Sequence, residues 1–406
     1  MKTRVLTAVI LWAGFLFLLP LPSRAQETIP VLRAEEPEIG AVLEQHLEEQ
    51  VRRLNIDSLD KYLRALQEEV GSYMPSLSWR EMWQNLREGR LPVEPGEVLP
   101  GLGRYFLREV WAGTKLLGQL VILAVAAAVL QNLQASLGEG TAGKVAHGIV
   151  FLALAGMALT SFTLAVEAAS QAIDRMVSFF QSLLPVLVTL LAASGGLTSS
   201  SLLHPVLIYS LTIAQTVTRN TIFPLIYCGA VLSVIGQISD RFPINRLAGL
   251  LRQFSLALLG LMLTLFTGVL SVYGIAGSVA DGIGLRAAEF ATSAFVPVVG
   301  KILSDAVSTV AGATLMLKSA VGLAGVIIIF FTATFPLLKI VSLALIYRMA
   351  AALVQPFGES QLSDALESMG GALLLVFACL IAVTLMFYLS IGVVVLLGNL
   401  IVALRG

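Results

Sequence analysis

Charged residues and cysteine are scarce in this chain of 406 residues. Charged side chains make up 13% of it, against roughly 25% in soluble globular proteins, whereas hydrophobic residues make up 57%. Both cysteines, Cys228 and Cys379, lie in apolar stretches, so a disulfide framework is excluded and two inert buried thiols are expected. This composition is typical of a membrane protein.

Catalytic and metal-binding patterns are also missing from the sequence. It has no Walker loop, no GxSxG elbow and no HExxH motif, and His46, His147 and His204 lack the spacing of metal ligands. Intramembrane hydrolases and lipid transferases need clustered acids, histidines or metal ligands. We therefore expect no enzyme activity, no cofactor and no metal. The net charge is zero and no segment is strongly basic, so no nucleic-acid partner is expected.

The first 25 residues have the pattern of a secretory signal peptide. Lys2 and Arg4 precede an apolar run from Val5 to Leu19, and Ser23-Arg24-Ala25 has the small residues of a cleavage site. An uncleaved signal anchor is the alternative, although the run is short for a full membrane span. In both cases the chain after residue 25 starts outside the cytoplasm.

Residues 26–110 predict a small extracytoplasmic helical domain and a linker. The segment has 16 acidic and 10 basic residues, half of all charges in the chain. Apolar residues at helical spacing indicate two amphipathic helices, the second starting near Asp57 and stopping at Gly71, and prolines between residues 92 and 100 favour a linker. So small a core should pack on a partner or on the membrane surface. We expect the stripe of Leu59, Leu63 and Leu66 to bind another protein.

Residues 111–406 predict a polytopic membrane domain, and the fold class is all-α. Lipid cannot satisfy open backbone groups, and the alternation of a β-barrel is absent. Several of the apolar segments are short for a span and the last is long, so the number of crossings stays open. The predicted segments are 112–133, 145–166, 183–203, 205–217, 222–238, 254–275, 295–317, 321–335, 337–353 and 371–404.

An internal repeat organises the membrane domain. Leu152–Thr163 (LALAGMALTSFT) and Leu256–Thr267 (LALLGLMLTLFT) are identical at eight of twelve positions. Proline landmarks downstream, at 185 and 297 and at 224 and 336, recur at a constant separation. The repeat units cover residues 144–240 and 248–354, followed by the final span or spans at 371–404. With four spans in each unit the copies are parallel, as in many transporters and channels.

Two polar features interrupt the apolar segments. The small polar run around Ser194, Gly195 and Gly196 is either a re-entrant loop that lines an aqueous path or a tight turn at the membrane surface. Lys301 and Asp305 form an opposite-charge pair four residues apart, on one face of a helix. Because charges are unfit for lipid, we expect this pair to line a conduit or to contact a partner helix, or else to anchor the span near a membrane surface.

Orientation follows from the positive-inside rule, by which short cytoplasmic loops collect Lys and Arg. With residues 26–110 outside, the cluster of Arg241, Arg246 and Arg252 falls on the cytoplasmic side. The same scheme places Asp281 and Glu289 outside and Lys318 inside. It does not account for the acidic residues Glu359, Asp364 and Glu367.

A family resemblance rests on the whole arrangement and on two segments. The order of signal peptide, acidic helical exported domain and repeated polytopic region resembles stage III sporulation protein AE of endospore-forming bacteria. The segments that carry the resemblance are PVLVTLLAASGGLTSSSLLHP (Pro185–Pro205) and FVPVVGKILSDAVSTV (Phe295–Val310). The resemblance implies a component of the mother-cell membrane around the forespore. It also implies a channel between the two cells, other membrane subunits as partners, and a requirement for late forespore gene expression.

Two classes of function are supported. The first is a permease-like or scaffold subunit of a multiprotein transenvelope channel, which the resemblance implies and which suits an exported domain in need of a partner. The second is a self-sufficient secondary transporter, which suits the repeat and the Lys301 and Asp305 pair.

Overall fold

The structure is a computed structural model in which every regular element is a helix among the residues described. Those residues are 57–71, 73, 78, 81–82, 84–85, 95–137, 141–237, 244–295, 299–357 and 360–403. The predicted signal peptide, the first amphipathic helix and most of the exported domain lie outside them. From Leu54 onward the chain forms one unit.

The described part contains six helices long and apolar enough to cross a membrane, which confirms the predicted all-α polytopic bundle. The third of them is continuous through a π-helical turn, so α7, η2 and α8 form one rod. The long elements are α5 (Pro95–Leu137), α6 (Thr141–Ala193), α7 (Leu197–Val217) with η2 (Thr218–Ile222) and α8 (Phe223–Ile235), α9 (Asn245–Phe295), α10 (Val299–Val354), which ends in the 3₁₀ turn η3 (Gln355–Phe357), and α11 (Ser360–Ala403).

Ten apolar segments had been expected, and the structure joins several neighbours into one helix. Segments 145–166 and 183–203 share α6 up to Ala193, where that helix ends inside the second segment. The intervening charges at 167–175 lower the hydropathy without breaking the helix, because charged residues other than Asp are good helix formers. Pro185 lies within α6 and Pro336 within α10, so neither proline ends a span.

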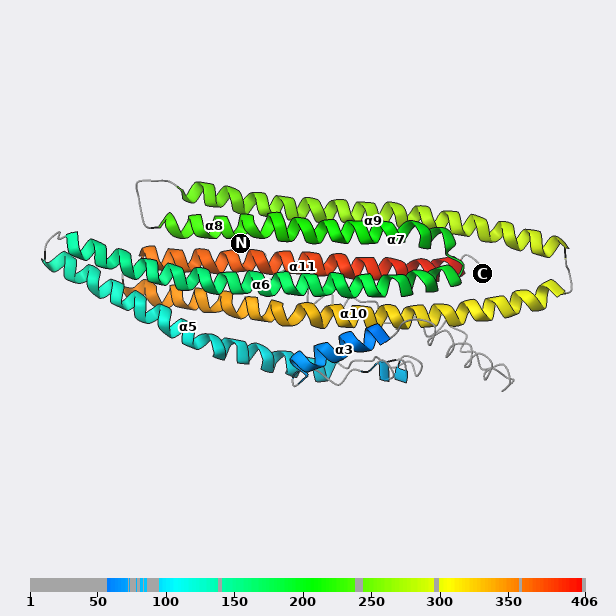
Figure 1. Cartoon of the computed structure of the whole chain (residues 1–406), viewed down its shortest axis with the longest axis horizontal. Coiled ribbons are helices and arrows are strands. Elements are labelled where there is room, and N and C mark those ends of the chain that lie inside the picture. The colour runs from blue at the N-terminus through cyan, green and yellow to red at the C-terminus, as the bar shows by residue number, and fades with distance from the viewer. Residues whose placement is uncertain are drawn as a thin grey trace. The chain divides into compact units, whose positions relative to one another are not determined.

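Consecutive rods run in opposite directions, and α10 and α11 form the centre of the bundle (Figure 1). Helix α11 packs against α10, α6, α9 and α8, while α5 packs on α10 and α6. In the most apolar stretches of α10 and α11, 61% and 67% of the residues are buried, compared with 22% in α5 and α9. Close contacts in the centre occur at glycines, because a Cβ on Gly322 would lie 2.3 Å from a methyl of Val395.

The predicted repeat units each correspond to two rods: α6 with α7–α8, and α9 with α10. Two rods per unit give both copies the same direction, as expected for a parallel repeat. Matched residues also make matched hydrogen bonds. Thr160 donates to the Gly156 carbonyl at 2.8 Å and Thr264 to the Gly260 carbonyl at 2.8 Å. The repeat stays a prediction from the sequence, and these features agree with it.

Helix α3 (Asp57–Val70) is the described part of the exported domain. It starts at Asp57 and stops at Gly71, whose N–H donates to the Gln67 carbonyl, as the sequence predicted. It packs against α10 and α6 of the membrane domain. The predicted proline linker is partly helical instead, since α5 begins at Pro95. Proline is tolerated there because the N–H groups of the first turn lack partners inside the helix.

Candidate functional site: a polar cluster midway along the apolar helices

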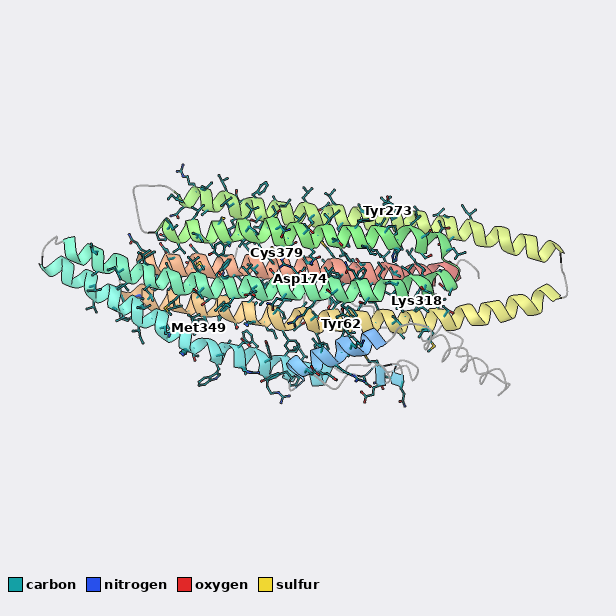
Figure 2. All side chains as sticks on the ribbon, viewed as in Figure 1. Tyr62, Asp174, Tyr273, Lys318, Met349 and Cys379 are labelled. Carbon is teal, nitrogen blue, oxygen red and sulfur yellow. The ribbon has the colours of Figure 1, made fainter. Side chains whose placement is uncertain are left out.

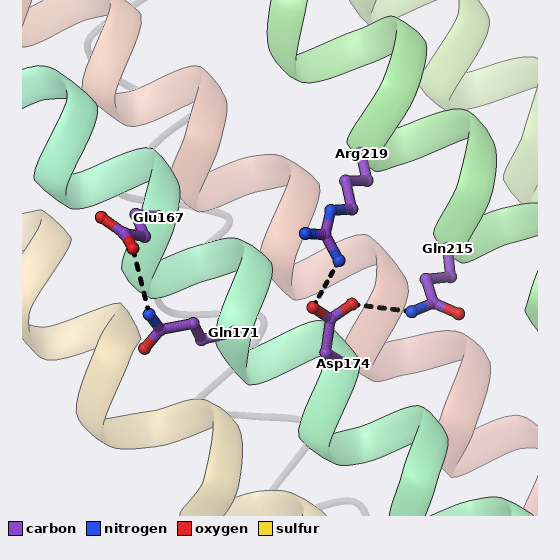
Figure 3. A network of polar contacts seen from close by, with 5 residues as sticks. All are labelled: Glu167, Gln171, Asp174, Gln215 and Arg219. Carbon is purple, nitrogen blue, oxygen red and sulfur yellow. Dashed lines mark hydrogen bonds and ion pairs between the residues drawn. The ribbon is translucent and has the colours of Figure 1, made fainter.

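Five polar residues of α6, α7 and η2 form a network that we call the mid-helix cluster. Arg219 donates to the Asp174 carboxylate at 2.6 Å, and the other oxygen of that carboxylate accepts from the Gln215 amide at 2.7 Å. Earlier on the same helix α6, the side-chain amide of Gln171 donates to the carboxylate of Glu167 at 3.3 Å. Figure 3 shows Asp174 of α6 pointing toward Arg219 and Gln215 on the neighbouring rod.

The cluster lies far from both ends of the apolar rods. Asp174 belongs to the candidate span Gly148–Ala193 and Arg219 to the candidate span Leu197–Ile235. At 1.5 Å per residue each of these two residues is roughly 24 Å or more from either end of its span.

A π-helical turn positions Arg219. The N–H of Phe223 donates to the Thr218 carbonyl, five residues back, and the next residue, Pro224, has no N–H to give. The wider turn covers Thr218–Ile222 and so includes Arg219. Such single-turn bulges are frequent at functional sites.

The ion pair is only partly covered by its own chain. The Arg219 side chain is 53% exposed and that of Asp174 is 36% exposed. A charge facing lipid costs at least about 2.5–3.5 kcal/mol on insertion scales, even before its partner is considered. The exposed side of the pair therefore needs water or another protein. The ion pair is therefore suited to binding a polar partner or to lining an aqueous path.

The polar run at Ser194–Gly196 forms the tight turn between α6 and α7, which was one of the two predicted alternatives. Gly195 adopts φ 102°, a conformation that favours glycine. Asp281 of α9 closes the turn, because its carboxylate accepts from the N–H groups of Thr198 (2.7 Å) and Ser199 (2.9 Å) at the start of α7. A carboxylate at a helix N-terminus is favourable to the helix dipole. A conduit role for Ser194, Gly195 and Gly196 stays a prediction.

Lys301 and Asp305 lie on the first turns of α10, as the helical prediction required. Their side chains are outside the described residues, so their pairing stays a prediction. Lys301 and Asp305 were the opposite-charge pair predicted from the sequence, and the structure adds a second pair, Asp174 with Arg219. That pair was missed because its members are 45 residues apart.

The predicted partner-binding stripe is partly buried by the chain itself. Leu63 is 1% exposed and Leu66 is 8% exposed, and the Tyr62 ring meets the Phe179 ring of α6 at 5.1 Å. In this structure the two leucines serve intramolecular packing. The side chain of Leu59 is outside the described residues, and binding of a partner by the stripe stays a prediction.

Lys318 was expected on the cytoplasmic side, but it lies near the start of α10, toward the end of the rods that carries Asp281 and opposite the arginines. It is 0% exposed, and its Nζ has no hydrogen-bond partner in the part of the chain that is described. Figure 2 labels it on α10. In those same described residues no group of three His, Cys, Asp or Glu is placed to hold a metal ion.

Comparisons with known proteins agree on one family. The family model described as Stage III sporulation protein AE matches residues 77–398. The protein named Stage III sporulation protein AE of Bacillus subtilis (strain 168) is 36% identical over 395 residues, which cover 97% of this chain and 99% of that protein. No solved structure matches the chain.

Proposed function

We propose, for a chain that belongs to the stage III sporulation protein AE family, a role as a membrane subunit of a channel between the mother cell and the forespore. In this proposal the protein is a permease-like or scaffold subunit that works with other membrane proteins. Its family makes it a sporulation protein, and its six apolar rods make it a multi-pass membrane protein. The observation that carries the finer proposal is the exposed mid-helix cluster.

The cluster argues for a neighbouring subunit or an aqueous path beside α6 and α7. If this part of α6 and α7 lies at the depth of the hydrocarbon, a secondary transporter that works alone would leave roughly half of the Arg219 side chain exposed to lipid. A second protein, or water held between subunits, removes that cost.

The apolar surface of α9 gives independent support. Large hydrophobic side chains are exposed along it from Leu247 to Ile283. These residues are 36 apart, so the surface extends about 54 Å along the helix. The hydrocarbon core of a bilayer is only about 30 Å thick. Lipid therefore leaves part of this surface uncovered, and other subunits supply the remaining cover.

Charge supports the predicted orientation. Arg246 and Arg252 lie in the first two turns of α9 and Arg348 in the last two turns of α10, at the same end of the antiparallel rods. Asp281 lies toward the opposite end of α9. By the positive-inside rule the arginine end is cytoplasmic, so α3 and the start of α5 lie outside, as the signal peptide requires.

A charge-exchange experiment tests the proposal in a spore-forming bacterium that lacks its own copy. Asp174→Leu alone leaves Arg219 unpaired and should abolish sporulation while the protein stays in the membrane. The exchange Asp174→Arg with Arg219→Asp restores the ion pair but swaps the positions of the two charges that a partner would contact. This variant should also fail to support sporulation. If Gln171→Cys forms crosslinks to other subunits in the parent protein, those crosslinks should be lost in the exchange variant. Glu109→Gln, a change at a half-buried charge of α5, is the matched control.

Normal sporulation with the double variant Asp174→Leu, Arg219→Leu would contradict the proposal. The mid-helix cluster would then face neither a partner nor an aqueous path, and the proposed role would lose its basis.

A further inference from the structure

A pocket of about 210 Å³ lies between α8, α9 and α11, away from the mid-helix cluster. Its polar lining consists of Ser233, Asn245, Arg252 and Ser368. The rest of its wall is apolar or glycine, including Gly249, where an added Cβ would meet nothing within 4 Å. Drug-sized ligands occupy pockets of roughly 300–1,000 Å³, so this pocket suits a smaller group.

The Arg252 guanidinium has unused donors in this pocket. Its Nε is buried without a hydrogen-bond partner, and its one hydrogen bond, to the Gly371 carbonyl, is long at 3.4 Å. A guanidinium has five N–H donors in a planar fork. Gly371 makes room for it, because a Cβ there would lie 3.2 Å from the guanidinium. Arg252 therefore presents donors to the pocket that the described residues do not satisfy.

The local charge is positive. The Arg348 side chain packs on Gly370 and is close enough to Arg252 for the two charges to repel each other. No carboxylate lines the pocket, and Arg252 forms no ion pair among the described residues. The pocket also lies at the start of α9, where the helix dipole is positive. Two adjacent cations without a counter-charge favour the binding of an anion.

The two serine hydroxyl groups in the pocket have no hydrogen-bond acceptor among the described residues. Most serines and threonines of these rods donate to a carbonyl of their own helix, as Ser255 does to Leu251 at 2.8 Å. Ser233 and Ser368 make no such bond. Hydroxyl, amide and guanidinium donors around one small space suit a phosphate group, which has several acceptor oxygens.

We propose that this pocket binds a phosphate group, presented either by an anionic lipid head group or by a free phosphate ion. The Arg252 guanidinium binds the phosphate oxygens, Ser233 and Ser368 donate to them, and Arg348 adds positive potential. The pocket is at the end of the rods where the arginines gather, which is the cytoplasmic end by the positive-inside rule. This site goes beyond the channel role and does not depend on it.

Thermal unfolding of the purified full chain tests the site and separates the two sources. In detergent, inorganic phosphate is titrated against chloride at equal ionic strength. In parallel, the chain is placed in nanodiscs of phosphatidylcholine, with or without an equal part of phosphatidylglycerol. A rise in melting temperature with phosphate identifies the free ion, and a rise with phosphatidylglycerol alone identifies the lipid. If neither raises it, the proposal is wrong.

Variants assign the effect to the pocket. Arg252→Gln should weaken phosphate or phosphatidylglycerol binding by at least about tenfold, since a hydrogen bond to a charged group contributes about 1.5–3 kcal/mol. Arg252→Lys keeps the charge and should give an intermediate loss, which also covers the case that Arg252→Gln does not fold. Arg246→Gln, on the same helix but outside the pocket, should bind as the wild type does. Equal losses for Arg252→Gln and Arg246→Gln would show a general charge effect and overturn the proposal.

Discussion

Replacing Lys318 by methionine should make the protein more stable. Lys318 is fully buried on α10, and its ammonium has no hydrogen-bond partner in the described part of the chain. Taking an ammonium out of water without a compensating partner costs on the order of several kcal/mol even after the protein relaxes. Methionine has a similar length, so it fills the same space without the charge and leaves no cavity. The free energy of unfolding should therefore rise by a few kcal/mol.

The assay follows the buried thiol of Cys379, which is 2% exposed and becomes reactive when the bundle opens. With the exposed Cys228 changed to serine, a maleimide dye reports unfolding of the detergent-solubilised chain as temperature rises. Lys318→Met should melt several degrees above the parent. Lys339→Met is the matched control, because Lys339 is on the same helix but exposed, and its melting temperature should hardly change.

The reasoning is refuted if Lys318→Met melts below the parent while Lys339→Met does not. The ammonium would then have a favourable partner in the folded protein. A variant that melts higher but no longer supports sporulation would show that the unpaired lysine is retained for function at a cost in stability.

Three further results are expected. Asp281→Asn removes the charge that caps α7 and should lower the melting temperature by an amount equal to about 1–2 kcal/mol; an unchanged melt would show that the cap contributes nothing. Leu63→Ala should cost about 2–5 kcal/mol and reduce the amount of protein in the membrane, whereas a normal amount with failed sporulation would favour partner binding by the stripe. In a cysteine-free background, a cysteine at Glu68 should react with an impermeant thiol reagent from outside and one at Asn245 should not; reaction of both would contradict the orientation.

Local features of the fold were accessible from the sequence, but the lengths of the rods were not. The helical spacing of Leu59, Leu63 and Leu66 predicts helix α3 (Asp57–Val70), because this periodicity acts within a few residues. The continuity of α6 depends on whether its charges at 167–175 find partners on another rod. A hydropathy profile contains no information on such partners, so the apolar segments 145–166 and 183–203 on either side were predicted as separate segments.

The pairing of Asp174 with Arg219 could have been found from the turn between them. Gly195 provides the turn, and the two residues lie at similar distances before and after it, about 21 and 24 residues. In an antiparallel hairpin of helices, residues at equal distances from the turn face each other. The buried state of Lys318 offers no such signal, because it depends on how α10 packs against rods from distant parts of the sequence.

The charged groups give the two repeat units different roles on a shared apolar framework. The proline landmarks of the second rods are 112 residues apart, so Arg219 corresponds to Phe331 and Lys318 to Val206. Each charge is thus present in one copy and replaced by an apolar residue in the other. In the first copy the charge is exposed at the surface of a rod whose apolar stretch is 33% buried, and in the second it is enclosed in a rod that is 61% buried. In the predicted repeat, the first copy thus carries its charge toward contacts outside the chain, and the second carries its charge into the core.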